Sequence, residues 1–334
     1  MRTFSPVAVE SSDVLPIEFR DGERVNFIGG TLIEREQRYG YWEHALTAAH
    51  PDKQITFRNL GWSGDTVWAE SRGIFDPPAK GYERLVAQVR ELDPTLLVFN
   101  YGGNEAWESF ASGEPVDAAI GRFLAQYAKL IDDVTPKPPA DGTAAATTTL
   151  APRVVLLTPL PLEKGVGPNA DPGAFNAHLA HYTAAIQKFA DDRGYPCLDL
   201  SAVHQWYQQE VANQRGLVRP LTQDGQQLSE YGYWRTANWL RDQLCGDVAA
   251  QTLRLPPLEA APMSESSPEQ TRSRELLAAI RTKNELYFHR WRPQNVTYLF
   301  LFRKHEQGQN AAEIPKFDPL VAEQERIIHQ LIQP

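Results

Sequence analysis

Residues 59–66 read NLGWSGDT and leave an apolar stretch of strand length, QITFRNL (54–60). The stretch 59–66 has the form Asn-x-Gly-x-x-Gly, and its second glycine, Gly64, has no side chain to block the approach to its backbone N–H. A backbone N–H at such a strand end can point at an oxyanion that develops during acyl transfer. The same glycines also suit an ordinary turn from a strand into a helix, so both interpretations of Gly64 stay open.

Three further short segments stand in a comparable context. GGT (29–31) ends the apolar stretch RVNFIG (24–29), and GGNE (102–105) ends TLLVFNY (95–101). The fourth segment, DGQQ (224–227), is predicted to open the last core helix. In each of these segments a polar side chain follows glycine or precedes it, which is typical of turns and also of binding sites at strand ends.

Apolar stretches alternate with helical patterns along most of the chain. The strand-length stretches are 24–29, 54–60, 95–101, 153–158 and 196–200, and the helical patterns include 82–92, 116–134, 174–193 and 229–244. Nearly continuous apolar strands indicate a sheet that is covered on both faces. The alternation therefore predicts an α/β protein, a three-layer α/β/α sandwich with a five-stranded parallel sheet and a site beyond the carboxyl ends of its strands.

Composition divides the chain into three parts. We expect an N-terminal arm (1–23), an α/β domain (24–250), and a linker with a helical, aromatic-rich C-terminal extension (251–334) that packs on the domain. A stretch rich in Pro, Ala and Thr (135–152) reads as a surface insertion within the domain, and 255–268 reads as the linker.

The C-terminal extension contains an unusual stretch, YFHRWRPQNVTYLFLFRKHEQGQ (287–309), rich in aromatic and basic residues. Its aromatic side chains would form an interaction patch if they were left exposed. One interpretation is that it covers the outer helices. The other interpretation is that the stretch covers the cleft at the strand ends and supplies Arg290, Arg292 or Lys304 to bind an anionic or sugar ligand.

Bulk properties exclude several functions. The formal charge of −9 and the absence of a Lys/Arg stripe argue against nucleic-acid binding. No apolar run approaches the ~20 residues that span a bilayer. The first ten residues lack the apolar core of a secretory signal, so we expect a cytoplasmic protein as the sequence stands, or an exported one if its start is mis-assigned or trimmed. No cofactor motif or metal cluster is evident, so no cofactor is implied.

The four segments, in this order, resemble those of the SGNH, or GDSL-type, ester hydrolases over roughly residues 24–245. The resemblance implies a flavodoxin-like fold and hydrolysis of carboxylic esters, including acetylated sugars, through an acyl-enzyme. In the family the segments supply a nucleophilic Ser, an oxyanion-hole Gly, an oxyanion-hole Asn and an Asp-x-x-His pair. The matching positions here are Thr31, Gly64, Asn104, Asp224 and Gln227.

Two of those five positions depart from the family pattern. Thr31 replaces Ser, and the extra methyl group stiffens the side chain and crowds the approach to an acyl carbon. Gln227 replaces His, and a primary amide is no general base near neutral pH. Thr31 with Glu34 also matches a capping box, in which Thr31 only caps the first helix.

Other residues are candidates to replace the missing side chains in the chemistry. Replacement bases would be Glu34, His204, His289 or His305, although a lone histidine is more often structural. A rival nucleophile, Ser63, stands in a GxSxG-like stretch that lacks the final glycine.

Three functions remain open on the sequence. The first is an ester hydrolase of weak or rebuilt activity. The second is a non-catalytic module that holds a small ester, acyl or carbohydrate ligand with Trp62, Trp107 or Trp291. The third is a scaffold whose C-terminal extension binds a protein partner. Three results separate these functions. An esterase loses turnover in Thr31→Ala, and a binding module keeps its ligand affinity in that variant. A scaffold loses its protein partner after truncation at Leu255.

Overall fold

The structure is a computed structural model that describes residues 15–135, 151–168, 171–214, 219–246, 253–259 and 266–333. Most of the insertion expected at 135–152 lies outside the described residues. So do residues 1–14 of the expected arm and residues 260–265 of the expected linker.

Five parallel strands form the central sheet. They are β1 (Arg24–Gly29), β2 (Thr56–Asn59), β3 (Leu96–Asn100), β4 (Arg153–Leu157) and β5 (Cys197–Leu198), in the order β2-β1-β3-β4-β5. This confirms the predicted five-stranded parallel sheet. The chain reverses its direction of winding between β1 and β3, and ligands of such sheets bind beyond the carboxyl ends of the strands at that point.

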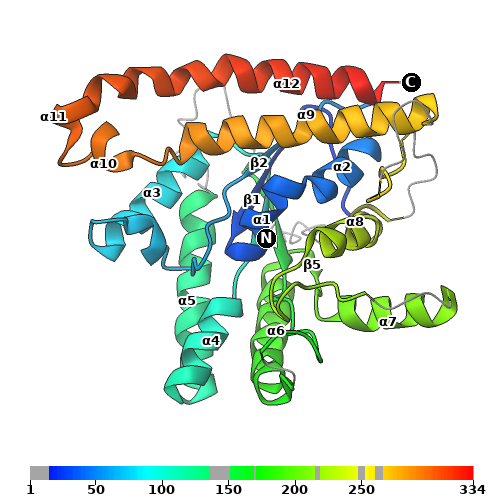
Figure 1. The fold of residues 1–334 in the computed structure, drawn as a ribbon. Coiled ribbons are helices and arrows are strands. Elements are labelled where there is room, and N and C mark those ends of the chain that lie inside the picture. Colours follow the sequence, from blue (N-terminus) through cyan, green and yellow to red (C-terminus); the bar gives the residue numbers. More distant parts are fainter. Residues whose placement is uncertain are drawn as a thin grey trace, which may run out of the picture.

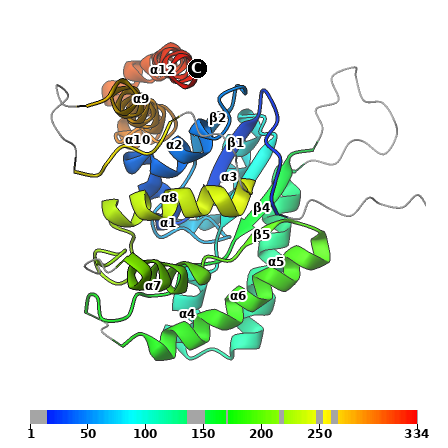
Figure 2. The ribbon, with the colours of Figure 1, turned by 90° about the vertical axis from the view of Figure 1, so that its right-hand side faces the viewer.

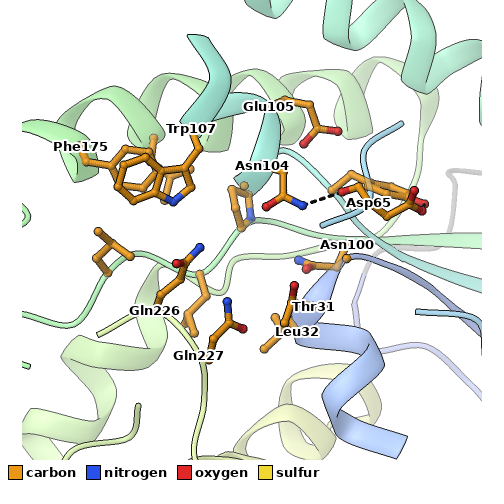
Figure 3. Close-up of a pocket in the computed structure, with 17 residues that line it drawn as sticks. Thr31, Leu32, Asp65, Asn100, Asn104, Glu105, Trp107, Phe175, Gln226 and Gln227 are labelled. Atoms are coloured by element: carbon orange, nitrogen blue, oxygen red, sulfur yellow. Dashed lines mark hydrogen bonds between the residues drawn. The ribbon is translucent and has the colours of Figure 1, made fainter. Parts of the chain in front are cut away.

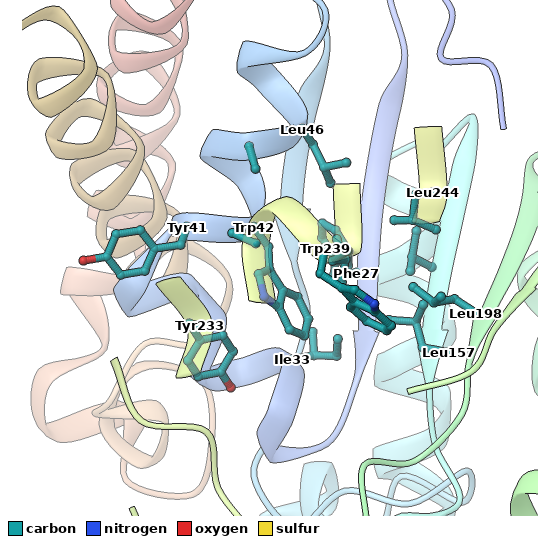
Figure 4. Packing of buried hydrophobic residues seen from close by; sticks show 14 of the residues in the cluster. Phe27, Ile33, Tyr41, Trp42, Leu46, Leu157, Leu198, Tyr233, Trp239 and Leu244 are labelled. Atoms are coloured by element: carbon teal, nitrogen blue, oxygen red, sulfur yellow. The ribbon is translucent and has the colours of Figure 1, made fainter. Parts of the chain in front are cut away.

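Helices cover both faces of the sheet, so the predicted three-layer sandwich is confirmed (Figures 1 and 2). One apolar cluster packs α1 (Thr31–Tyr39), α2 (Tyr41–Ala48), α7 (Ala202–Gln214) and α8 (Glu230–Cys245) on the sheet. Figure 4 shows Trp42, Tyr233 and Trp239 within this cluster.

The other face is covered by a second apolar cluster. It involves α3 (Pro78–Glu91), α4 (Gly103–Ser112), α5 (Val116–Val134) and α6 (Gly173–Arg193). A short 3₁₀ helix, η1 (Glu70–Gly73), precedes α3.

The C-terminal extension folds into a pair of long helices. α9 (Pro268–Trp291) and α12 (Phe317–Ile332) lie antiparallel along one side of the molecule (Figure 1). They are joined by α10 (Val296–Leu299), α11 (Lys304–Gln307) and the 3₁₀ helix η3 (Gly308–Lys316).

α9 contacts α1, α2 and the edge strand β2. Its Lys283 is 1% exposed and donates to Glu43 Oε1 of α2 at 2.5 Å and to the carbonyl oxygen of Phe57 at 3.1 Å, while Asn284 donates to Glu43 Oε2 at 3.1 Å. α9 thus packs on α1, α2 and β2 through a buried ion pair as well as apolar contacts.

Candidate active site

A small cavity of about 70 Å³ lies at the carboxyl ends of β1, β3 and β4. It contains three of the five predicted site residues, Thr31, Asn104 and Gln227, which Figure 3 shows facing the same space. The other lining residues are Gly30, Leu32, Asp65, Asn100, Tyr101, Gly103, Glu105, Trp107, Pro159, Leu160, Leu162, Phe175, Leu179 and Gln226.

Thr31 is the first residue of α1, directly after the glycines that end β1. A Cβ at Gly29 would lie 2.4 Å from the backbone oxygen of Asn100, so only glycine lets β1 approach β3 this closely. Thr31 Oγ1 accepts a hydrogen bond from the backbone N–H of Gly64 at 3.3 Å. The hydroxyl therefore points at the predicted oxyanion donor.

The capping box predicted for Thr31 and Glu34 is wrong. The backbone N–H of Glu34 bonds to the carbonyl oxygen of Gly30 at 3.0 Å, and the Thr31 side chain makes no capping bond. The Glu34 carboxylate turns outward, because it accepts the N–H of Ser63 and pairs with Arg292 of the C-terminal extension at 2.8 Å. A charged partner attracts a carboxylate more strongly than a neutral backbone N–H does.

The loop that carries Gly64 is fixed by close packing. A Cβ at Gly61 would lie 2.1 Å from the backbone nitrogen of Glu34, so the loop crosses α1 in contact with its backbone. Asn59 holds the turn, with its Oδ1 accepting from Gly61 N–H at 2.9 Å. Gly64 itself has a φ of +75°, a conformation that favours glycine.

A buried ion pair lies behind this loop. Asp65 Oδ2 accepts from Arg72 at 2.8 Å and from the Tyr101 hydroxyl at 3.0 Å, and both charged side chains are almost fully buried. Burial raises the pKa of Asp65, while the Arg72 guanidinium opposes that shift. The hydrogen bond from the Tyr101 hydroxyl to Asp65 ties the loop after β2 to the end of β3.

Asn104 lies at the start of α4, next to the glycines that close β1. Its Nδ2 donates to the backbone oxygen of Asp65 at 2.7 Å, and a Cβ at Gly30 would lie only 3.3 Å from the same nitrogen. The amide nitrogen carries two hydrogens, so one remains for an oxyanion beside the Gly64 N–H.

Glu105, next to Asn104, is structural. Its carboxylate accepts the N–H of Val67 at 2.8 Å and the N–H of Gly102 at 2.9 Å, so both oxygens hold backbone. Burial raises the pKa of Glu105 to about 7, against the two backbone hydrogen bonds that lower it. Like Asp65, it joins the loop after β2 to the loop after β3.

The segment DGQQ does not open α8, contrary to the prediction. Ser229 is the N-cap of α8, which begins at Glu230, and DGQQ forms a turn before it. Asp224 Oδ1 accepts the N–H of Gln226 at 3.0 Å and the N–H of Gln227 at 2.7 Å. Asp224 is outside the cavity lining, whereas the amides of Gln226 and Gln227 reach into it.

The proposed substitute bases lie elsewhere in the described structure. His204 Nε2 is 2.9 Å from the carbonyl oxygen of Pro161, and His289 packs against Phe317. The exposed His305 lies 3.9 Å from Glu306. Together with Glu34, these side chains are absent from the lining of the cavity, which within the described residues includes no histidine.

Two aromatic rings form one wall of the cavity. Trp107 and Phe175 stack with centroids 4.0 Å apart at an interplanar angle of 17° (Figure 3). Of the three tryptophans considered as ligand contacts, only Trp107 lines this cavity. Phe175 was missed, because its place in the amphipathic helix α6 marks it only as a core residue.

A serine–histidine contact also escaped the sequence analysis. Ser109 Oγ lies 2.8 Å from His178 Nε2 and 3.0 Å from the Tyr182 hydroxyl. Ser109 is 4% exposed on the inner face of α4 and is outside the cavity lining. We assign this pair to helix packing between α4 and α6.

The fold and the strand-end site together define an SGNH-type hydrolase architecture. A family model for GDSL-like lipases and acylhydrolases matches residues 25–235, which is more than half of the chain, and the chain belongs to this family. No curated protein sequence matches it significantly.

Solved structures share the fold at low sequence identity. A gut microbial diltiazem-metabolizing enzyme superposes with a TM-score of 0.68 at 12% identity, covering 95% of this chain and 96% of that one. Its similarity therefore extends over the C-terminal helices.

Two smaller esterases cover less of the chain. An acetylxylan esterase from Geobacillus stearothermophilus covers 66% of this chain and 94% of its own, at 20% identity and a TM-score of 0.44. An aryl esterase of M. smegmatis covers 66% of this chain and 97% of its own, at 15% identity and a TM-score of 0.45.

Among the described residues, no helix has the length and apolar character to span a membrane.

Proposed function

We propose that this protein is a slow ester hydrolase that removes a small acyl group, acetyl in size. Thr31 is the nucleophile, and the oxyanion is held by the Gly64 N–H and the Asn104 amide. The observation that carries the proposal is the contact of Thr31 Oγ1 with the Gly64 N–H at 3.3 Å, in the loop next to the cavity that Thr31 and Asn104 line. Family membership supports the ester substrate.

The size of the cavity limits the acyl group. A cavity needs about 10–15 Å³ to hold one water molecule, so 70 Å³ accommodates only a few non-hydrogen atoms. An acetyl group fits this space, whereas a long fatty acyl chain would have to extend out of the open side of the cavity. The alcohol part of the ester would then lie against the Trp107 and Phe175 rings, and the Gln226 amide could form hydrogen bonds with its hydroxyl groups. This arrangement suits an acetylated sugar.

In the first step the Thr31 oxygen bonds to the acyl carbon, and the bond from that carbon to the alcohol oxygen breaks. The hydroxyl proton passes through water to the leaving alcohol, because the Gln227 amide does not take it up. Water then attacks the acyl-threonine and releases the acid. Without a positioned base, the expected acceleration is the ~10³–10⁴-fold over water that an oxyanion hole and binding provide alone.

Binding of the ligand without turnover is the second candidate. It is favoured by the turn 224–227, in which the Asp224 carboxylate binds its own backbone and Gln227 replaces the imidazole. A site of this kind would hold a carbonyl compound at Gly64 and Asn104 and leave it intact.

Hydrolysis of p-nitrophenyl acetate by the wild type, Thr31→Ala, and Thr31→Ser combined with Gln227→His separates the two candidates. We expect slow wild-type turnover that Thr31→Ala abolishes, and faster turnover in the combined variant. p-Nitrophenyl octanoate should be hydrolysed much more slowly by every active form, because its acyl chain exceeds the cavity.

Each alternative result has a defined meaning. Turnover in the combined variant alone identifies a binding site on an esterase scaffold. Turnover in Thr31→Ala equal to that of the wild type rules out Thr31 as the nucleophile.

A further inference from the structure

A second and larger cavity lies between the α/β domain and the C-terminal extension. Its volume of about 640 Å³ is within the range of cavities that bind small organic molecules, roughly 300–1,000 Å³. The domain contributes Trp62, the end of η1 and the outer part of α3, and the extension contributes the end of α9 and the segment around α10. None of its lining residues belongs to the lining of the cavity at Thr31.

Most of the lining is apolar or aromatic. Trp62 and Trp291 meet edge to face with centroids 6.0 Å apart, and Phe288 packs on Trp291 at 6.3 Å. Val296 and Leu301 complete the side formed by the extension. Such walls bury the body of an aromatic or aliphatic ligand.

Residues of this lining also carry buried polar atoms without a hydrogen-bond partner among the described residues, and one of them, Arg72, has its guanidinium 5.6 Å from the Trp62 ring centroid and 5.9 Å from the Trp291 ring centroid. Arg72 is 1% exposed, yet its Nη1 has no hydrogen-bond partner among the described residues, while its other nitrogens bind Asp65 and the Leu60 carbonyl. The Gln88 amide oxygen and the Trp291 indole N–H, also in the lining, lack partners within the same described residues. A buried donor without an acceptor is unfavourable by about 1–3 kcal/mol, and a ligand that accepts from it recovers that free energy.

The charges of the cavity are already balanced. Arg72 pairs with Asp65, and Arg292 pairs with Glu34 at 2.8 Å. The remaining cation, Arg84, pairs with Asp76. An anionic ligand would have to compete with these carboxylates, whereas a neutral ligand leaves every pair in place.

We propose that this cavity is a second ligand site, which binds a neutral organic molecule with an aromatic body and a carbonyl or similar oxygen acceptor. The Arg72 Nη1 hydrogen donates to that oxygen, and the ring system lies in the cavity against Trp291, Phe288 and Leu301. The site is independent of the chemistry proposed for Thr31, since it requires neither an ester nor a nucleophile.

The two sites share one loop. Trp62 lines the second cavity, the Ser63 N–H donates to Glu34, and the Gly64 N–H donates to Thr31 Oγ1. Three consecutive residues therefore connect an occupant of the second site with the oxyanion donor of the first.

The test uses prodan, an uncharged fluorescent naphthalene ketone that is not an ester. Titration of the full-length protein should give saturable binding with one site, a blue-shifted emission and quenching of tryptophan fluorescence. 2-Dimethylaminonaphthalene, which lacks the ketone, should bind about tenfold more weakly if Arg72 donates to the carbonyl.

Variants on α10 locate the site. Val296→Trp fills the cavity and should weaken prodan binding at least about tenfold, whereas Thr297→Trp, on the same helix but outside the lining, should not change it. Far-UV circular dichroism and thermal melting confirm that both variants fold. The absence of saturable binding, or equal binding by the two folded variants, would overturn the proposal.

Failure of the second site and failure of the proposed esterase are distinguishable. Prodan binding is measured without an ester, and turnover of p-nitrophenyl acetate is measured on the same preparations without prodan. Either result can therefore be negative while the other is positive.

Discussion

The two halves of the candidate active site face one cavity but are built differently. In the half that carries Gly64 and Asn104, buried carboxylates join the loop after β2 to the loop after β3. Asp65 accepts hydrogen bonds from Arg72 and Tyr101, and Glu105 accepts them from two backbone N–H groups. The half that carries Gln227 is a surface turn closed by the exposed Asp224.

If the proposed function holds, this difference bears on why Gly64 and Asn104 keep the residue types expected from the family and position 227 does not. The oxyanion half is also the junction between two loops, so its residues contribute to folding as well as to binding. The turn is closed by the Asp224 carboxylate and backbone N–H groups, so we expect substitutions of the side chain at position 227 to change stability little and replacement of Asp65 to destabilise the fold.

Removal of the buried carboxylate of the first half should have the largest effect. Asp65→Ala leaves Arg72 charged and uncompensated in the interior, so we expect a loss of about 3–5 kcal/mol in the free energy of unfolding. Urea denaturation measures this loss. Asp192→Ala breaks the exposed pair of Lys188 with Asp192 at 2.9 Å on α6 and should be within about 1 kcal/mol of the wild type. Similar losses of unfolding free energy in the two variants would show that the buried carboxylate matters no more than the exposed one.

Removal of the oxyanion amide should have the next largest effect. Asn104→Ala is expected to lower kcat for p-nitrophenyl acetate by about 10²–10³-fold in whichever form turns over, the wild type or Thr31→Ser with Gln227→His. Gln226→Ala, which lines the same cavity, is the control and should lower kcat less than about tenfold. Equal losses would show that Asn104 acts only through the shape of the cavity.

The buried Glu105 of the first half should also make the free energy of unfolding depend on pH. The folded state raises the pKa of Glu105 from 4.5 to about 7, so the folded protein holds a proton there that the unfolded chain has released. The stabilisation is complete below pH 4.5 and is lost as the pH rises through 7. Relative to Glu105→Gln, the wild-type free energy of unfolding should fall by about 3 kcal/mol across this window. Parallel pH profiles of the two proteins in urea would refute this.

The smallest effect is expected in the second half. Asp224→Asn keeps the side-chain oxygen that closes the turn, so turnover should stay within about twofold of the wild type, whereas the acid of a working triad is worth about 10⁴-fold. Asp224→Ala removes the hydrogen bonds that close the turn, so it should lower the free energy of unfolding by about 1 kcal/mol. A large drop in turnover for Asp224→Asn would mean that its carboxylate takes part in the chemistry.

The sequence predicts elements better than it predicts partners. β1 and α5 have the predicted bounds, because a buried strand and an amphipathic helix reveal themselves through local apolar patterns. The capping box of Thr31 and Glu34 was wrong because Arg292, distant in the chain, takes the Glu34 carboxylate. DGQQ was placed on α8 although Ser229, a good N-cap residue, follows it.

The candidate site shows the same limit. The sequence predicted the strand-end positions of Thr31, Gly64 and Asn104, because parallel strands bring their carboxyl ends to one edge. It could not predict Phe175, nor the cavity between Trp62 and Trp291. These depend on how helices from distant parts of the chain come together.

The ion pair of Lys283 with Glu43 has a consequence for protein engineering. The family match ends at residue 235, which suggests a module that could be excised or fused elsewhere. A fragment cut after α8 would leave Glu43 without its cation and expose the apolar surface of α2 and β2 that α9 covers. A transplantable version of the α/β domain must therefore keep α9, or carry a redesigned outer face with a neutral residue at position 43.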